Sequence, residues 1–261
     1  MGTLCFQVLS SGSSGNACLV WTNNTCILID AGLSVKALKE RMKTSSIDPS
    51  QLDAVVVSHE HYDHVRGLGP LSRMYNLEVY ISPETFQSLP AKTNNIPRKR
   101  FFTRGKPFEI GDLTILPFAL PHDASDPTGF VIANGITRLA ICTDLGTPTN
   151  LVKSCISKCQ AIILESNHDV EMLQNGPYPI HLKQRIRSRV GHLSNDQALE
   201  LCREISHQEL EVLCLAHLSK INNSKDLVMN NIVSTLRNQP QWRCVQFFIA
   251  EQDEPLAAIK L

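Results

Sequence analysis

The residues best suited to chemistry lie in one short segment, Ser-His-Glu-His-Tyr-Asp-His, at positions 58–64. It holds four possible metal ligands within six residues: His59, His61, Asp63 and His64. Divalent transition metals prefer imidazole nitrogens and carboxylate oxygens, at about 2 Å from the ion. The segment directly follows a short apolar run, 54–57, which predicts a buried strand, and a loop at a strand end can direct several side chains to one point. We therefore expect a metal site here.

Three further candidate ligands lie at the ends of other predicted strands: His122, Asp144 and His217. Taken singly, each has a structural alternative. His122 could be a loop residue, Asp144 could cap a turn, and His217 could be a hydrogen-bonded core imidazole. Four ligands from one loop cannot complete two coordination spheres, however, and a metal pocket at the edge of a β-sandwich requires ligands at several strand ends. Their recurrence there therefore favours a shared metal pocket.

The elements that must position these residues follow an α/β rhythm, in which short β-rich runs alternate with longer amphipathic ones. Strands are expected at residues 6–9, 17–21, 26–30, 54–57, 78–81, 113–118, 129–133, 138–143, 161–164, 211–215 and 245–251. A helix is expected at 34–43, and another after Ser194, an N-cap with Gln197 as its capping-box partner. Since we find no repeat, linker or composition shift, we expect one continuous domain over residues 1–261, with two packed sheets covered by helices.

Composition excludes several classes of protein. The 261 residues are 43% hydrophobic and 19% charged, which is typical of a globular enzyme-sized chain rather than a disordered one. Lys+Arg and Asp+Glu number 25 each, so any attraction to nucleic acid must be local. The longest apolar runs have strand length, far below the roughly 20 residues of a membrane span. Without an export segment, we expect a cytoplasmic protein whose nine cysteines are reduced.

The spacing His-x-His-x-Asp-His at positions 59–64 resembles the hallmark of the metallo-β-lactamase-fold metallohydrolases. The resemblance implies an α/β fold, a four-layer αββα sandwich of two mixed sheets flanked by helices. It also implies that two divalent ions are bound, the first by His59, His61 and His122, the second by Asp63, His64 and His217, with Asp144 between them. Two ions held in this way can activate water and neutralise phosphoryl oxygens. The ligand types fit Zn²⁺, Mn²⁺ and Fe²⁺ alike.

Segments outside this motif resemble particular relatives. Residues 10–20 and 27–32 are similar to the opening of the superfamily, in which Asp30 would steady the metal loop; alternatively, Asp30 only ends a strand at a turn. Residues 165–169, 191–195 and 215–223 are similar to the YycJ or WalJ branch, which is related to tRNase Z and composed of DNA exonucleases. This implies a phosphodiesterase, a 5′-to-3′ exonuclease, whose partner is nucleic acid, with DNA favoured over RNA.

Lengths argue against other branches of the superfamily. Only 73 residues separate Asp144 from His217, too few for the domain that RNase J-type enzymes insert there. Only 44 residues follow His217, too few for the helical domain of glyoxalase-type relatives. True β-lactamases usually use a Cys ligand at the second metal and are exported, so antibiotic hydrolysis is disfavoured.

Local charge suggests where an anionic substrate could bind. Residues 172–195 contain no Asp or Glu, and four cations precede His192: Lys183, Arg185, Arg187 and Arg189. Such a segment could hold phosphates, although a charge run is often only a solvated face. A second basic group at 98–106 surrounds Phe101 and Phe102 and could grip a backbone and stack on bases, unless the phenylalanines belong to the core.

Two histidines are left over once the metal ligands are assigned. Gly191-His192-Leu193-Ser194 is similar to the Gly-His-Ser segment of the tRNase Z relatives, with a leucine inserted. The resemblance implies that His192 is a general acid or a phosphate donor, with Ser194 as a substrate contact. A helix N-terminus disfavours a cationic imidazole, so Glu165 or another carboxylate must offset it. His168 is either a phosphate contact or a loop residue.

The expected reaction is phosphodiester hydrolysis, with His192, His168 and Asp63 as catalytic candidates. Two alternatives stay open. The substrate could be a small phosphodiester such as a cyclic nucleotide, with the basic residues merely on the surface. Less favoured is a non-enzymatic regulatory domain in which the metals only stabilise the fold.

Overall fold

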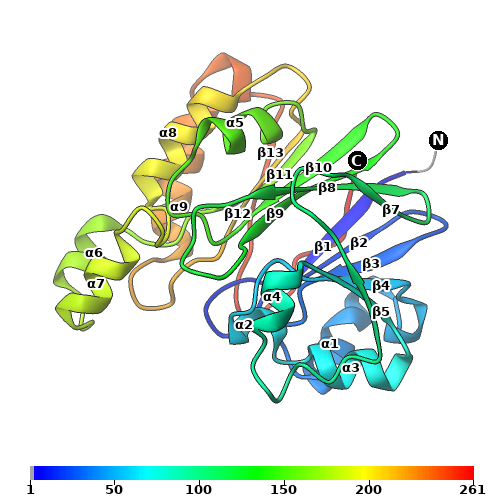
Figure 1. Cartoon of the computed structure of the whole chain (residues 1–261). Helices are drawn as coiled ribbons and strands as arrows, with labels where there is room; N and C mark the ends of the chain where they lie inside the picture. Colours follow the sequence, from blue (N-terminus) through cyan, green and yellow to red (C-terminus); the bar gives the residue numbers. More distant parts are fainter. Residues whose placement is uncertain (1–2) are drawn as a thin grey trace.

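Two seven-stranded sheets pack face to face in the computed structural model, which describes residues 3–261 (Figure 1). Helices cover the outer face of each sheet, so the molecule has four layers in the order helix, sheet, sheet, helix. The predicted αββα sandwich is therefore confirmed. Among residues 3–261, no helix is long and apolar enough to cross a membrane.

The N-terminal sheet is mixed. Its order is β14 (Ile259–Lys260), β1 (Cys5–Ser10), β2 (Ala17–Trp21), β3 (Cys26–Ile29), β4 (Ala54–Val56), β5 (Glu78–Ile81) and β6 (Arg98–Phe101). The strands from β14 to β3 are antiparallel, and those from β3 to β6 are parallel. The helices on this side are α1 (Val35–Met42), α2 (Tyr62–Val65), α3 (Leu68–Tyr75) and α4 (Pro83–Gln87).

The C-terminal sheet has a similar mixed arrangement. Its order is β13 (Gln246–Ile249), β12 (Val212–Ala216), β11 (Ala161–Glu165), β10 (Thr137–Cys142), β9 (Thr128–Asn134), β8 (Leu113–Ala119) and β7 (Phe108–Ile110). The strands from β7 to β10 are antiparallel and those from β10 to β13 are parallel. The remaining helices are α5 (Asn150–Ile156), α6 (Val170–Asn175), α7 (Ile180–Ile186), α8 (Asn195–Ile205), α9 (Lys225–Val228) and α10 (Ser234–Arg237).

Strand β11 shows how the sequence builds three apolar layers. Ala161 and Ile163 face the core between the sheets, whereas Ile162 and Leu164 face the helices, as the two-residue period of a strand requires. A third cluster lies between the N-terminal sheet and its helices and includes Leu38. Because the sheets are covered on both faces, the central strands β3 and β4 are apolar throughout.

The edges of the sheets differ from the sequence-based expectation. Strand β6 was not expected, because its four residues are all exposed and carry no alternating apolar pattern. Arg98 and Arg100 in β6 form ion pairs with Glu78, and Phe102 is buried in the core, only 5% exposed. The second basic group therefore has structural partners. The predicted cap at Ser194 is confirmed as a complete capping box at the start of α8.

Candidate metal centre and active site

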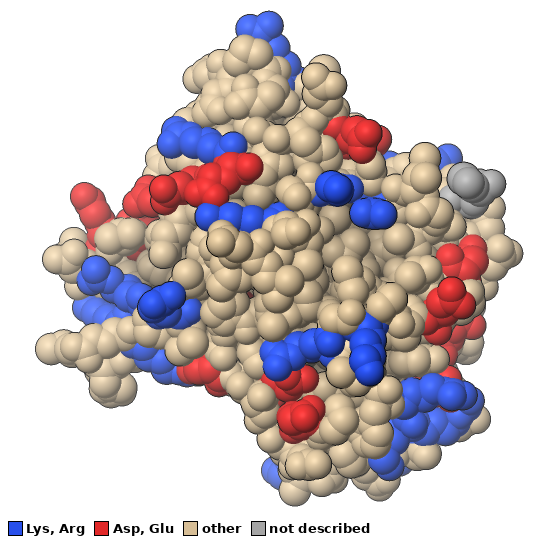
Figure 2. All heavy atoms as spheres, turned by 45° about the horizontal axis from the view of Figure 1, so that its top comes forward, with Lys and Arg blue, Asp and Glu red and all other residues tan. Residues whose placement is uncertain are grey.

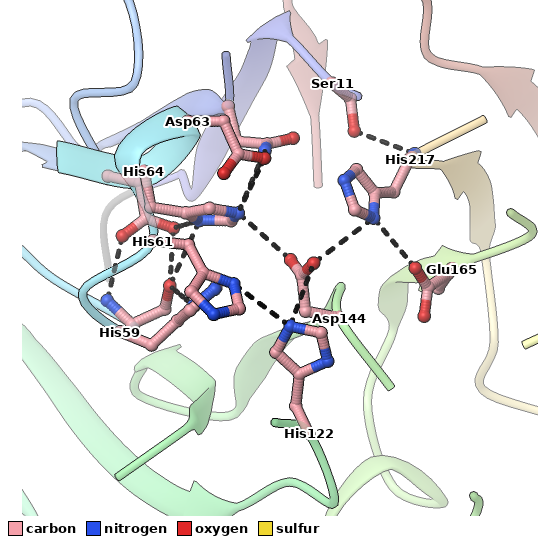
Figure 3. Close-up of polar contacts among 12 residues, drawn as sticks. Ser11, His59, His61, Asp63, His64, His122, Asp144, Glu165 and His217 are labelled. Atoms are coloured by element: carbon pink, nitrogen blue, oxygen red, sulfur yellow. Dashed lines mark hydrogen bonds and ion pairs between the residues drawn. The ribbon is translucent and has the colours of Figure 1, made fainter. Parts of the chain in front are cut away.

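The seven predicted ligands converge at one edge of the molecule, where loops from both sheets meet. Four of them leave the end of β4, and the other three follow β8, β10 and β12. Their ligand atoms form overlapping groups within 4.8 Å of one another: His59–His61–His122, His59–His64–Asp144 and Asp63–His64–His217. Figure 3 shows these side chains directed toward a common space around Asp144. Segments as far apart as residues 59 and 217 thus meet at one point.

The loop after β4 is held in place by Asp30. Its carboxylate accepts hydrogen bonds from the Ser58 amide and the Ser58 hydroxyl, each at 2.8 Å, and from His64 Nδ1 at 2.7 Å. Gly32 lets the chain pass close to this loop, since a Cβ there would lie 1.6 Å from the carbonyl oxygen of Asp63. The Asn16 amide donates to that same carbonyl at 2.7 Å. The ligand loop is therefore held in place by hydrogen bonds to Asp30 and Asn16.

Each of the five clustered imidazoles has one nitrogen engaged with a protein group on its outer side. The partners are Ser58 Oγ for His59 Nδ1 at 2.9 Å, the Asp123 carbonyl for His61 Nε2 at 3.2 Å, Asp30 for His64 Nδ1, the Gly191 carbonyl for His122 Nδ1 at 3.1 Å and Glu165 for His217 Nδ1 at 2.7 Å. Carbonyl and carboxylate oxygens only accept, and the Ser58 hydroxyl already donates to Asp30, so the proton lies on the outer nitrogen of each ring. Such outer partners orient metal-binding histidines.

The inner nitrogens of the same rings lie close together, and two of them have no protein partner. His59 Nε2 and His217 Nε2 are buried and have no hydrogen-bond partner. His122 Nε2 lies 3.3 Å from His61 Nδ1, so two inner nitrogens face each other. His64 Nε2 lies 3.1 Å from Asp144 Oδ2 and 3.7 Å from Asp63 Oδ2. Buried nitrogens without partners beside carboxylates are the donor set that zinc, manganese or iron would take, so the residues fit divalent metals.

The charges in this cluster are strongly coupled. Burial opposes a charge on His64 and His217, but nearby carboxylates outweigh it, Asp144 first, and raise the pKa of His64 well above its usual range and that of His217 to about 9. Burial lowers the pKa of His59, and His64 adds to the effect. Burial also opposes the charge of Asp144, but His217 and His64 lower the pKa of that carboxyl group. The cluster is therefore a buried set of imidazoles and carboxylates that stabilise one another's charges.

Three residues of the site adopt left-handed backbone conformations. Asp30, Asp144 and His217 have φ values of 59°, 63° and 57°. Each follows a strand, and the sharp turn directs the side chains of Asp144 and His217 into the pocket and that of Asp30 toward the ligand loop. The turn at His217 is held on both sides, because its amide donates to Ser11 Oγ at 2.8 Å and its carbonyl accepts from Asn167 Nδ2 at 2.9 Å. Such conformations are uncommon for residues other than glycine.

Glu165, the last residue of β11, joins the metal cluster to His192. Its Oε1 accepts from His217 Nδ1 and from His192 Nδ1, each at 2.7 Å, and its Oε2 accepts from the Leu145 amide at 2.6 Å. Burial opposes the charge of Glu165, but His192 and His217 lower its pKa to about 2. Burial likewise opposes a charge on His192, whereas Glu165 raises its pKa. Glu165 thus offsets the unfavourable helix N-terminus beside His192.

The other predicted site residues, which are not metal ligands, differ in burial and in their hydrogen-bond partners. His168 is 2% exposed, its Nδ1 has no hydrogen-bond partner, and burial lowers its pKa to about 4. Ser194 is buried and its hydroxyl accepts from the Gln197 amide, so the cap occupies it. Arg185 forms an ion pair with Asp123, next to His122.

The cations of the basic segment do not form one continuous cluster. Lys183 donates to the Gln174 carbonyl at 2.9 Å, and Arg187 is close enough to His168 to lower the pKa of that imidazole. Arg189 is exposed, and its carbonyl accepts from Thr147. Figure 2 shows blue side chains in several separate groups on the face that it draws, with red ones between them. Of the four, only Arg185 binds through its side chain to a loop that carries a candidate ligand.

Comparison with known protein families and sequences identifies the family of this chain. Residues 25–217 match the model of the beta-lactamase superfamily domain. The chain belongs to the beta-lactamase superfamily. Within this superfamily it is 38% identical over 238 residues, 90% of each chain, to exodeoxyribonuclease YycJ of Bacillus anthracis. It is 34% identical over 236 residues, 88% of this chain and 87% of the other, to exodeoxyribonuclease WalJ of Streptococcus pneumoniae serotype 2.

Among solved structures, the superfamily fold is shared with the metallo-beta-lactamase fold protein YhfI from Bacillus subtilis. The two chains are 17% identical, with a TM-score of 0.72 and full coverage of both. The predicted membership and the YycJ or WalJ branch are confirmed. As a member of this superfamily, the chain is a metal-dependent hydrolase.

Several residues of the superfamily site were missed in the sequence. Glu165 was considered only as a possible offset for His192, because it ends an apolar strand and belongs to no ligand spacing. Asn16 Nδ2 lies 2.9 Å from His64 Nε2, and the Asp123 carbonyl accepts from His61. The position of Glu165 directly after four apolar residues could have identified it, since a charge at the end of a buried strand needs a partner.

Proposed function

We propose that this superfamily member is a two-metal exodeoxyribonuclease that shortens DNA in the 5′-to-3′ direction. The observation that carries the proposal is the arrangement of five imidazoles whose outer nitrogens are held by protein acceptors, so that their inner nitrogens face one pocket. Relatives that share about nine-tenths of their length with this chain are named exodeoxyribonucleases, which supports a DNA substrate. The direction rests on the resemblance to that branch.

The pocket offers two neighbouring sets of ligands. His59, His61 and His122 would hold one ion, and Asp63, His64 and His217 the other. Asp144 lies between the sets. Its Oδ2 is 3.1 Å from His64 Nε2, and its Oδ1 is 3.4 Å from His217 Nδ1 and 3.7 Å from His122 Nε2. When bound, two divalent ions lower the pKa of a water molecule and neutralise the oxygens of a phosphodiester under attack.

His192 is suited to protonate the leaving oxygen. Its Nδ1–H is held by Glu165, so Nε2 is free to face a substrate. Its side chain is 19% exposed, whereas those of His64, His122 and His217 are at most 2% exposed. Of these four rings, His192 alone therefore reaches the surface of the pocket. A positioned imidazole contributes typically 10²–10⁴-fold as a general acid.

Neighbouring phosphates would be held by groups on the α7 side of the pocket. Arg185 is placed there by Asp123, and His168 lies near Arg187 and His192 at the end of β11. A buried, neutral imidazole can donate its one N–H to a phosphate oxygen without bringing a further charge. We assign Arg185, Arg187 and His168 to substrate phosphates, and Lys183 and Arg189 to the outer part of the same path.

The test is hydrolysis of oligonucleotides by metal-depleted protein that is resupplied with Mn²⁺ or Zn²⁺. DNA and RNA strands labelled at the 5′ or the 3′ end, single- and double-stranded, separate the possible products on one gel. The Asp63→Ala, His64→Ala double variant is the control for contaminating nucleases, and Glu200→Gln on the exposed face of α8 is the matched neutral substitution.

Stepwise, metal-dependent shortening of DNA from the 5′ end that the double variant abolishes supports the proposal. Shortening from the 3′ end would overturn the direction, and preferred cleavage of RNA would overturn the substrate. Inert oligonucleotides beside rapid turnover of bis(p-nitrophenyl) phosphate would indicate a phosphodiesterase of small substrates instead.

A further inference from the structure

Two aromatic side chains, Tyr62 and Phe101, are prominent on the surface, each 54% exposed. Phe101 lies on β6 and packs edge-on against Phe86, with ring centroids 5.7 Å apart. Tyr62 differs, because among residues 3–261 its ring has no aromatic neighbour and its hydroxyl no hydrogen-bond partner. Leaving an aromatic ring in water forgoes the free energy of its burial, so packing does not explain this side chain.

The position of Tyr62 connects it with the active site. It is the first residue of α2 and stands between His61 and Asp63, two of the candidate ligands. Those neighbours and the buried His64 and Val65 fix the backbone of this short helix. The exposed ring is therefore carried by a short helix whose position is fixed by the candidate ligands on either side of Tyr62.

Arg66 lies four residues after Tyr62, and the Arg66 amide donates to the Tyr62 carbonyl at 2.9 Å. Residues four apart share one face of a helix, so the two exposed side chains are neighbours. Among residues 3–261, the Arg66 guanidinium forms no ion pair or hydrogen bond. An unpartnered cation thus accompanies the unpartnered ring on the α2 side of the pocket, whereas the basic segment lies on the α7 side.

We propose that Tyr62 and Arg66 bind an unpaired nucleotide next to the cleaved one, with the base stacked on the Tyr62 ring and its phosphate paired with Arg66. The inference rests on the proposed nuclease function and adds the form of the substrate. A base within a duplex is covered on both faces and paired on its edge, whereas an unpaired base has a free face. The enzyme therefore prefers single-stranded or frayed ends to blunt duplex ends.

The experiment is a double-mutant cycle in which one change removes the Tyr62 ring from the protein and the other removes one base from the substrate. Binding is measured by fluorescence anisotropy on metal-loaded protein, with oligonucleotides whose phosphorothioate linkages resist cleavage. Normal strands are compared with strands carrying one abasic position at each of the first three nucleotides. Stacking of one base on an aromatic ring is worth about 1–3 kcal/mol, which corresponds to roughly 5- to 150-fold in the dissociation constant.

We expect Tyr62→Ala to weaken binding of the normal strand by a factor in this range. For the wild type, one of the abasic strands should bind more weakly than the normal strand by a similar factor. The Tyr62→Ala variant should bind that abasic strand almost as well as it binds the normal strand. Tyr62→Trp and Tyr62→Phe keep a ring beside the ligands and should bind within about twofold of the wild type or tighter. Phe101→Ala, with the same exposure at a distant edge, is the matched control and should change nothing.

Steady-state kinetics on cleavable strands give the second readout. Tyr62→Ala and Arg66→Gln should raise KM with little change in kcat, and Tyr62→Ala should reduce the preference for frayed over blunt ends. Arg203→Gln, an exposed arginine of α8, is the control for the loss of one positive charge.

The outcomes separate this inference from the proposed function. If wild-type protein cleaves DNA but the abasic and Tyr62→Ala losses simply multiply at all three positions, the stacking contact is refuted and the nuclease stands. If the wild-type enzyme prefers blunt duplex ends, the unpaired nucleotide is refuted as well. If wild-type protein cleaves no oligonucleotide, the proposed function fails, and this inference fails with it.

Discussion

Replacing Glu165 by glutamine would place the new NH₂ group against another hydrogen-bond donor, because every group that faces Glu165 donates to it. Oε1 accepts from His192 and His217, and Oε2 accepts from the Leu145 amide, so both oxygens serve as acceptors. A glutamine side chain has a single acceptor oxygen. In one orientation its NH₂ group meets the Leu145 N–H, and in the other it meets the two imidazole N–H groups.

The loss can be estimated from these contacts. Leaving one buried donor unsatisfied costs about 1–3 kcal/mol, and hydrogen bonds to a charged partner are roughly twice as strong as neutral ones. We therefore expect Glu165→Gln to lower the free energy of unfolding by about 2–4 kcal/mol. The protein can avoid this loss only if both imidazoles move their Nδ1 protons to Nε2, which in His217 is the nitrogen that faces the pocket. In that case metal affinity falls instead, by roughly 10–100-fold, as for other lost partners of metal-binding histidines.

Two measurements cover both possibilities. Urea unfolding of the metal-loaded protein gives the stability, and competition with a chelating dye gives the affinity for each ion. Glu200→Gln, which removes an exposed carboxylate from α8, is the control. A Glu165→Gln protein that unfolds within about 0.5 kcal/mol of the wild type and keeps the affinity for both ions would refute the assignment of Glu165 as the group that orients His217.

Three further predictions concern backbone space, pH and salt. Gly32→Ala should lower the free energy of unfolding by at least about 3 kcal/mol, because its Cβ would lie 1.6 Å from the Asp63 carbonyl oxygen. Gly105→Ala, the control, has no atom within 4 Å of its Cβ but a φ of +79°, and should lower it by only about 1–2 kcal/mol. Equal losses in urea unfolding would contradict this. His168 has a folded-state pKa of about 4 against 6.5 in the unfolded chain, so the unfolded state takes up a proton first and stability is lost as the pH falls from about 6.5 to 4. The loss caused by His168→Gln should therefore be about 2.5 kcal/mol larger at pH 8 than at pH 4.5, and a pH-independent difference would show that the imidazole is not held neutral. Finally, the logarithm of the binding constant for single strands should fall by about 0.7 per tenfold increase in salt concentration for each phosphate contact, and cleavage at low substrate concentration should fall with it. Arg185→Gln combined with Arg187→Gln should therefore make this slope shallower by about 1.4. An unchanged slope would show that neither arginine contacts a phosphate.

The sequence predicts the clustered ligands and the central strands because both depend on local patterns. His59, His61, Asp63 and His64 are close in the chain, and a buried strand of the length of β11 is recognisable from its apolar run. By contrast, the partners of those ligands come from distant segments. That the Asp123 carbonyl faces His61, or that one oxygen of Glu165 serves two rings, depends on how the loops pack after the sheets have formed.

Edges and surfaces are predictable to a smaller extent. Strand β6 contains three cations and one phenylalanine, so its sequence is typical of a solvated loop, and only pairing with β5 makes it a strand. Phe101 and Phe102 are adjacent in the sequence, yet Phe101 is exposed on β6 and Phe102, directly after the strand, is buried in the core between the sheets. Tyr62 carries no signal in the sequence beyond its place between two ligands.

The left-handed turns at Asp30, Asp144 and His217 link the stability of the chain to its metal content. For a residue with a Cβ, that conformation costs roughly 1–2 kcal/mol compared with the right-handed one, and all three occur where the pocket needs a side chain. His217→Gly would relax its turn while removing a ligand, so metal-free protein with this change should lose less stability than the size of the deletion suggests. The full protein recovers the cost when ions bind, because ligands that bind only the folded state stabilise it by mass action. Chelation should therefore lower the melting temperature of the native chain more than that of a His217→Gly chain, and thermal shift assays with and without a chelator would report metal loading without a substrate.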